Sequence, residues 1–194
     1  DELNRLLVIT DSLNNVVSYT YDPAGNRLTE TDQNGYTSTY SYDELKRVIT
    51  VTDHLDNQTT FNYDATGNQT VLTDALNRTT RTWYDALNRP VTVTVNYKDG
   101  VFAPGSPDQD LSTITTYDQV GNVIQITGHA SRGTQYEYDA VGQLITITDA
   151  LSGTSVNVYD AVGNLVQLSN PKSQSTRFGY DALGRLITTT DALS

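Results

Sequence analysis

Apolar and polar residues alternate over short stretches along the whole chain, and the alternation keeps a fixed place relative to a recurring Tyr-Asp dipeptide. Seven and nine residues after each such tyrosine the side chain is mostly Val, Ile or Leu, whereas Thr, Gln and Ser dominate at eight and ten. Residues 145–148, Ile-Thr-Ile-Thr, show the pattern without interruption. Alternation with period two, rich in Val, Ile and Thr, predicts a strand with one buried face.

A second, more polar strand is predicted directly before each Tyr-Asp. Because side chains two positions apart share a face of a sheet, an aromatic residue two positions before the tyrosine should lie beside it. Aromatic and β-branched cross-strand pairs stabilise a ladder by about 0.2–1 kcal/mol each. We therefore expect two antiparallel strands in each repeat. The aromatic residues at this position are Tyr19, Tyr40, Phe61, Tyr136 and Phe178.

The Tyr-Asp dipeptide recurs every 21 residues, with a single step of 33 residues between Tyr84 and Tyr117. A fixed period of this length sets the architecture of a chain before any local motif does. In most copies Gly follows three residues after the Asp. The positions to which we assign a structural role in the repeat are Tyr21, Asp22, Gly25, Tyr42, Asp43, Tyr63, Asp64, Gly67, Tyr84, Asp85, Tyr117, Asp118, Gly121, Tyr138, Asp139, Gly142, Tyr159, Asp160, Gly163, Tyr180, Asp181 and Gly184.

A finer period of 10 or 11 residues places an Asp three residues before a Gly, an Asn or another residue that tolerates positive φ. Asp at the first turn position bonds its own backbone two residues on, and Gly or Asn at the fourth accepts positive φ. These features predict a type I turn with a G1 bulge. Lys46 follows Asp43 at the fourth position, which predicts a strained or different turn there. Gly128 and Asn170 replace the Asp of two other turns and weaken the prediction for them.

The predicted fold is all-β: an antiparallel up-and-down meander of tandem 21-residue repeats that forms a long curved or spiralling β-ribbon. We expect one repeat array over residues 1–194, with a loop insertion at about 96–112, where two Pro and two Gly oppose a regular strand. A wide twisted sheet must curl, split or be covered. Its two end strands should be open edges, so we expect isolated copies to associate edge to edge.

Composition narrows the classes of partner. The chain has no Cys, which excludes disulfides and thiolate metal ligands. Its net charge of −11 argues against nucleic acid, because phosphate contacts need clustered Lys and Arg. No apolar run approaches the roughly 18 residues of a membrane span, and no signal peptide opens the chain. The chain begins inside a repeat and contains no Met, so we expect a segment of a longer array whose export signal lies outside it.

Candidate chemistry is sparse. His54 and His129 lie far apart in sequence, without a Ser or Cys nucleophile at motif spacing, and no hydrolase, phosphate-binding or dinucleotide motif occurs. An Asp that recurs with every turn is expected to be structural. The turns at Asp32 and Asp53 offer several oxygens but lack an EF-hand pattern, so we expect capping and no metal. We predict no catalytic residue and no cofactor. Sugar binding stays open, because repeated aromatic residues suit either packing or a glycan surface.

The segments YDPAGNRLTETD (21–32), YDAVGQLITITDA (138–150) and YDALGRLITTTDA (180–192) resemble the Rhs, or YD-repeat, family. That family includes the shells of bacterial polymorphic toxins, the cocoon of Tc toxin complexes and the extracellular barrel of teneurins. The resemblance covers nearly the whole chain. It implies a β-ribbon that spirals into a hollow shell, which in toxins encloses a C-terminal effector. The repeat Tyr and Gly carry over as structural positions only.

From this resemblance, the leading functional prediction is a non-enzymatic segment of a shell that encapsulates a toxin or effector. The alternative is a cell-surface adhesion or carbohydrate-binding repeat module. The expected partners are the rest of the same shell and an enclosed effector domain, with self-association and glycans as further candidates. Neither nucleic acid nor membrane insertion is expected. The expected location is outside a bacterial cell, either secreted or on the cell surface.

Overall fold

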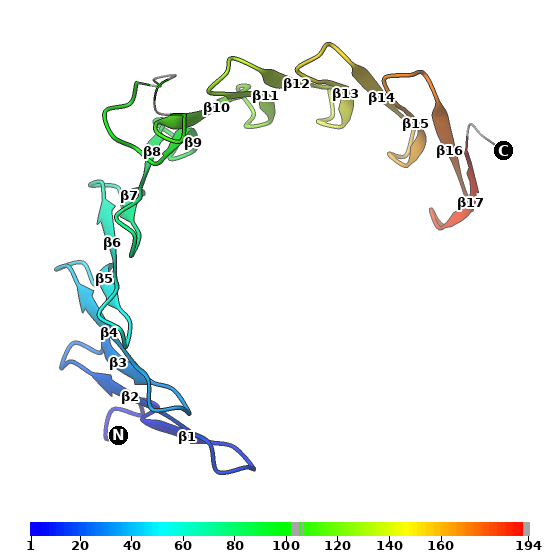
Figure 1. The fold of residues 1–194 in the computed structure, drawn as a ribbon. Coiled ribbons are helices and arrows are strands. Elements are labelled where there is room, and N and C mark those ends of the chain that lie inside the picture. The colour runs from blue at the N-terminus through cyan, green and yellow to red at the C-terminus, as the bar shows by residue number, and fades with distance from the viewer. Residues whose placement is uncertain (102–104, 106, 192–194) are drawn as a thin grey trace. The chain divides into compact units, whose positions relative to one another are not determined.

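A computed structural model describes residues 1–101, 105 and 107–191 of the chain. These residues form seventeen strands and no helix. The chain divides into two compact units, residues 1–110 and the residues from Leu111 onward, and each unit is described by itself. Figure 1 shows that within each unit the strands follow one another in chain order.

Each strand of a unit pairs antiparallel with the next strand along the chain. This topology confirms the predicted all-β meander. The strands of the first unit are β1 (Val8–Thr10), β2 (Val16–Tyr21), β3 (Arg27–Thr31), β4 (Thr37–Tyr42), β5 (Val48–Thr52), β6 (Gln58–Tyr63), β7 (Gln69–Thr73), β8 (Thr79–Tyr84) and β9 (Pro90–Val95). Those of the second are β10 (Leu111–Tyr117), β11 (Val123–Gly128), β12 (Gly133–Tyr138), β13 (Leu144–Thr148), β14 (Thr154–Tyr159), β15 (Leu165–Ser169), β16 (Ser175–Tyr180) and β17 (Leu186–Thr190).

Two kinds of ladder alternate along each unit. The hairpin that contains a Tyr-Asp turn, such as β4–β5, is paired up to the tyrosine and has a bulge there, because Ser41 faces Thr50 and Tyr42 faces Val48. The residue skipped on the partner strand is the apolar residue seven positions after the tyrosine. The ladder that joins two such hairpins, such as β3–β4, has no bulge and begins only at Thr29. Strands of neighbouring hairpins are therefore unpaired near their Tyr-Asp turns.

The turns have the predicted geometry. At Asp53 the backbone N–H of Asp56 donates to the carbonyl of Asp53 at 3.1 Å, and Asp53 N–H donates to the carbonyl of Asn57 at 3.0 Å. One carboxylate oxygen of Asp53 accepts the N–H groups of Leu55 and Asn57 at 2.8 and 3.0 Å. Asp56 has φ of 62°, as the fourth position requires. The repeat glycines Gly25, Gly67, Gly121, Gly142, Gly163 and Gly184 take the same position with positive φ.

Of the two alternatives predicted at Asp43, a strained or a different turn, the different turn is wrong. Lys46 N–H donates to the carbonyl of Asp43 at 3.0 Å, as in the other turns, and Lys46 adopts φ of 62°. The left-handed conformation disfavours a residue with a Cβ, but the surrounding ladders fix the backbone whatever the side chain. The Lys46 ammonium donates to the carbonyl of Ala24 in the preceding turn at 2.8 Å, which offsets part of that cost.

The turns at Gly128 and Asn170, which lack the Asp, also have the same backbone geometry as the other turns. Gly128 makes the same two backbone hydrogen bonds as the aspartates, and Ser131 supplies the positive φ of 56°. Asn170 replaces the carboxylate by its amide oxygen, which accepts the N–H groups of Lys172 and Gln174 at 2.9 and 3.0 Å. The side-chain cap therefore favours this turn but is not needed for it, because the ladders on both sides already bring the strand ends together.

The described residues of neither unit form an apolar core. Among the described residues no apolar side chain is buried, and the two buried residues are Thr94 and Asp110. Large aliphatic side chains at the turn tips are mostly exposed, for example Val141 at 80% and Val162 at 83%. Thr replaces an aliphatic residue at several of the apolar strand positions, and this composition predicts a sheet without a thick apolar core. Hydrogen bonds of ladders and turns therefore hold the fold together more than burial does.

The insertion at about 96–112 is described only in part, because residues 102–104 and 106 lie outside the described residues. Its two ends close on each other: Asp110 N–H donates to the carbonyl of Asn96 at 3.1 Å. The Asp110 carboxylate accepts the N–H groups of Lys98 and Gly100 at 2.8 and 2.9 Å, which lowers its pKa. The described ends thus form a closed base for the loop.

Candidate functional site

The hydroxyl of the repeat tyrosine bridges neighbouring hairpins. Tyr42 donates to the carbonyl of Arg27 at 2.8 Å, and Tyr63 donates to that of Val48 at 2.8 Å. Each acceptor lies where the ladder to the tyrosine's own strand has not begun. The phenol therefore satisfies a carbonyl that the sheet leaves unpaired. The same tyrosine bridge, always to the carbonyl 15 residues earlier, is made by Tyr21, Tyr84, Tyr138, Tyr159 and Tyr180.

Hydrogen bonds within the turns lower the pKa of several repeat aspartates. The Thr66 hydroxyl, together with the Asn68 amide and backbone N–H groups, lowers the pKa of Asp64 from 3.8 to about 2. The side-chain amide of Asn26 lowers the pKa of Asp22 in the same way. Hydrogen bonds to a carboxylate favour its charged form. These carboxylates therefore serve as turn acceptors and have no free proton to offer as general acids.

The residue four positions after the repeat Asp controls the space between neighbouring turns. Arg47 forms an ion pair with Asp43 at 2.7 Å and donates to the carbonyl of Asp64, in the next Tyr-Asp turn, at 3.1 Å. Its guanidinium carbon also lies 4.6 Å from the ring centroid of Tyr63. An Asn at this position, such as Asn68, donates to its own Asp at 3.0 Å and reaches the next Tyr-Asp turn through the side-chain oxygen of Asn88 at 2.8 Å.

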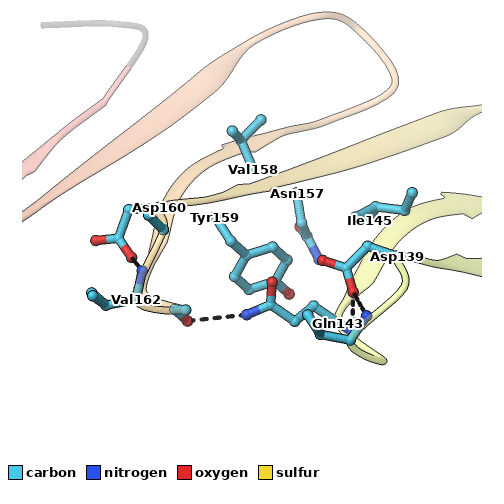
Figure 2. A pocket seen from close by; sticks show the side chains of 11 residues that line it. Asp139, Gln143, Ile145, Asn157, Val158, Tyr159, Asp160 and Val162 are labelled. Atoms are coloured by element: carbon cyan, nitrogen blue, oxygen red, sulfur yellow. Dashed lines mark hydrogen bonds between the residues drawn. The ribbon is translucent and has the colours of Figure 1, made fainter.

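A polar recess lies beside this residue at two places, where the residue is Gln143 or Asn68. In the second unit it has a volume of about 560 Å³, and Figure 2 shows Asp139, Gln143, Asn157 and Tyr159 in its lining. The side chains of Asn157 and Tyr159 both donate to the carbonyl of Leu144, at 2.9 and 3.0 Å. The same repeat positions line a recess of about 430 Å³ in the first unit. The two recesses thus lie at corresponding positions of the repeat in the two units.

The two candidate histidines lie in different turns, one in each unit. The ring of His54 stacks on Tyr36 with 4.1 Å between centroids, and His129 belongs to the turn at Gly128 in the other unit. Within the described ranges, no group of three or more His, Cys, Asp or Glu is placed to hold a metal ion. In the same part of the chain, no helix is long and apolar enough to cross a membrane.

Sequence reasoning missed two features. One is the role of the residue four positions after the repeat Asp, which is visible as a restricted choice of Arg, Asn and Gln at that position. The other is a cluster of Arg81, Trp83 and Tyr97 in the first unit. Its signal in the sequence is a break in the repeat, because two of these side chains occupy positions that other copies mostly fill with smaller residues.

A family model of the RHS Repeat matches residues 1–37, 42–79, 117–154 and 159–194, which is most of the chain. The chain belongs to the RHS repeat family. Its matched segments carry the Tyr-Asp turns described above, so the repeats that the family model detects are the hairpins of the two units. The comparison with curated proteins found no match.

The RHS repeats also resemble solved toxin structures. The Tc holotoxin pore of Photorhabdus luminescens matches with a TM-score of 0.70 and 20% identity over 89% of this chain. The crystal structure of TcdB2-TccC3 matches with a TM-score of 0.68 and 21% identity over 91% of this chain. The crystal structure of TcdB2-TccC3 without its hypervariable C-terminal region matches with a TM-score of 0.69 and 20% identity over 91% of this chain. In each case this chain spans 10% of the matched chain. At this identity the likeness establishes the fold.

Proposed function

We propose that this chain is a non-enzymatic wall segment of an RHS-type shell that encloses a toxin or effector. One observation carries the proposal: the recurring polar side chains of the repeat serve the backbone. The repeat tyrosines bridge hairpins, the aspartates cap turns and the glycines supply positive φ. The likeness to Tc toxin structures supports the same role, and one of these proteins, TcdB2-TccC3, has a hypervariable C-terminal region.

The mechanism of such a wall is exclusion. Within each unit a continuous antiparallel ladder satisfies the backbone groups of its inner strands, so the sheet needs no second layer to complete its hydrogen bonds. A protease needs an extended, accessible segment of chain as its substrate. The sheet would block contact between the protease and the polypeptide enclosed by the shell. Containment by this means requires no catalytic group.

Limited proteolysis of the natural polypeptide that carries these repeats tests the proposal. The enclosed region should resist a protease that digests the same region when it is produced alone. Replacing Tyr138, Tyr159 and Tyr180 together by Phe removes three bridges and should speed its cleavage. Tyr36→Phe is the matched control, because the Tyr36 hydroxyl has no hydrogen bond to the described residues. Equal cleavage of the enclosed and the isolated region in the unaltered protein would refute containment.

Self-association through open edges is a second part of the proposal. Every residue of β1 and of β17 is exposed. Among the described residues, β1 pairs with β2 and β17 pairs with β16. An exposed strand with unpaired N–H and C=O groups accepts another strand, either from the rest of a shell or from a second copy.

Carbohydrate binding at the cell surface is the competing candidate, and the polar recess favours it. Asp139, Gln143 and Asn157 offer acceptors and donors beside the ring of Tyr159, which are the groups that sugar hydroxyls use. A glycan array probed with this chain tests it. Gln143→Arg should remove binding at this recess, because the arginine would bridge to the next turn as Arg47 does. A blank array for the unaltered chain would eliminate this candidate.

A further inference from the structure

Three side chains meet in the first unit at a place where the repeat is broken. Arg81 and Trp83 lie on β8, and Tyr97 follows β9 at the start of the insertion. Most repeat positions serve the fold, so a group of departures in one place points to a role outside it. In the other copies, the position of Trp83 holds Thr20, Ser41, Asn62, Thr116, Glu137, Val158 and Gly179.

The guanidinium of Arg81 is held against both rings. Its central carbon lies 4.9 Å from the ring centroid of Trp83 and 5.1 Å from that of Tyr97. The two ring centroids are 5.8 Å apart, with planes at 64°. One guanidinium nitrogen donates to the Tyr97 hydroxyl at 3.2 Å. The Tyr97 backbone is itself fixed by a 2.7 Å hydrogen bond to the carbonyl of Thr79.

The charge of Arg81 is not neutralised within the described part of the chain. Six other arginines form ion pairs with a carboxylate, whereas no described carboxylate lies within ion-pair distance of Arg81. Arg132 and Arg177 also have no ion pair with a described carboxylate, but no ring contact is recorded for either of them, whereas Arg81 lies against two rings. A guanidinium has five N–H donors, and cation–π contacts orient it without using them. The donors not bonded to Tyr97 thus remain available to a ligand.

A recess lies next to these donors. Arg81 and Trp83 line the first unit's recess of about 430 Å³, whose rim carries the amides of Asn68 and Asn88. The guanidinium covers part of the Trp83 and Tyr97 rings and so reduces the ring surface on which a sugar could stack. The amide nitrogen of Asn68 donates to the side-chain oxygen of Asn88 at 2.8 Å, so the groups left for a ligand are mainly the N–H donors of the guanidinium. These donors match the carboxylate of a peptide.

We propose that Arg81, Trp83 and Tyr97 form a binding site for a carboxylate of a polypeptide, either a side-chain carboxylate or a C-terminal one. Arginine suits this ligand because its planar fork of donors matches the two oxygens of a carboxylate. The rings keep the fork in one orientation and offer an apolar surface to the group that carries the acid. The site is independent of containment, since it would act equally on an enclosed segment or on an outside partner.

Trp83 is the only tryptophan of the chain, so its fluorescence reports directly on the site. The probes are N-acetylphenylalanine, with a terminal carboxylate, N-acetylglutamic acid α-amide, with a side-chain carboxylate, and the uncharged N-acetylphenylalaninamide. At least one acid should give a saturable change. The amide should bind about tenfold more weakly or worse, because it lacks the charge-assisted hydrogen bonds. Comparison of the two acids tells which carboxylate the site prefers.

Arg81→Gln should abolish the saturable change, and Arg81→Lys should weaken it. Arg177→Gln is the matched control, because Arg177 occupies the same repeat position on β16 and has no ring contact or ion pair among the described residues. Equal binding of acid and amide to the unaltered chain, the lack of any saturable change, or full binding by a folded Arg81→Gln variant would each overturn the proposal. The comparison of acid with amide needs no variant, so it decides even if Arg81→Gln fails to fold.

Discussion

Removing single tyrosine hydroxyls measures how much the bridges contribute. Tyr138 Oη donates to the carbonyl of Val123 at 3.0 Å, and the β11–β12 ladder begins only at Gln125. Tyr138→Phe keeps the ring and removes this hydrogen bond. A typical intramolecular hydrogen bond contributes about 0.5–1.5 kcal/mol net. We expect a loss of about 1 kcal/mol in the free energy of unfolding.

Tyr159 provides an internal comparison with the same geometry. Its acceptor, the carbonyl of Leu144, also receives the side-chain amide of Asn157 at 2.9 Å. After Tyr159→Phe that carbonyl keeps one partner, so the loss should be about half as large, roughly 0.5 kcal/mol. Combined with Asn157→Ala, the loss should exceed the sum of the two single losses, because the last partner of the carbonyl is gone.

Urea unfolding followed by circular dichroism gives these free energies. The ordering is the decisive result: Tyr138→Phe should cost more than Tyr159→Phe, and Tyr36→Phe should cost almost nothing. If Tyr138→Phe lowered the free energy of unfolding no more than Tyr36→Phe does, water would hydrogen-bond to the Val123 carbonyl as well as the tyrosine does. The bridge would then not explain why Tyr recurs in the repeat. If Tyr159→Phe cost more than Tyr138→Phe, the account of shared acceptors would be wrong.

Three further predictions follow from the turns and edges. Lys46→Gly should raise the free energy of unfolding by about 0.5–1 kcal/mol because it relieves a left-handed Lys, and Gly25→Ala should lower it by a similar amount in a thermal melt. The pKa of Asp64 is lowered from 3.8 to about 2, so the Asp64 carboxylate stabilises the fold above pH 3.8 and this contribution is lost as the pH falls towards 2. Asp64→Asn should therefore flatten the dependence of the free energy of unfolding on pH in this range. Sedimentation at rising concentration should show association of the isolated chain, and Thr188→Pro in β17 should reduce this association. A monomer at all concentrations would contradict the prediction.

The sequence predicts the strands and turns well because both depend on local chemistry that repeats. Alternation with period two and an Asp three residues before a positive-φ residue each act within a few positions, so the pattern at Asp53 is sufficient to place a turn. Lys46 shows the limit of that reasoning. Its tolerance of positive φ is decided by the ladders on either side and not by its own preference.

The rest depends on contacts between hairpins, which no short window of sequence contains. The tyrosine bridge spans 15 residues and exists because the ladder between hairpins begins late, as at Thr29. Likewise, Arg47 donates to the carbonyl of Asp64 in the next Tyr-Asp turn, and Gln143 lines a recess beside the next turn. Both the tyrosine bridge and the contact between neighbouring turns depend on where strands of neighbouring hairpins separate, and the position of the bulges determines where they separate.

A sheet without a buried apolar side chain must draw its stability from many small polar contacts, each linking a hairpin to its neighbour. In such an array, stability is a sum over repeats and their interfaces, and a side chain can persist in every copy only if every interface uses it. This explains the recurrence of Tyr and Asp without any ligand. By the same reasoning, a side chain present at one interface alone is not maintained by the fold. Trp83 meets that condition and holds Arg81 beside it, so ligand binding should be sought there before it is sought in the recurring tyrosines.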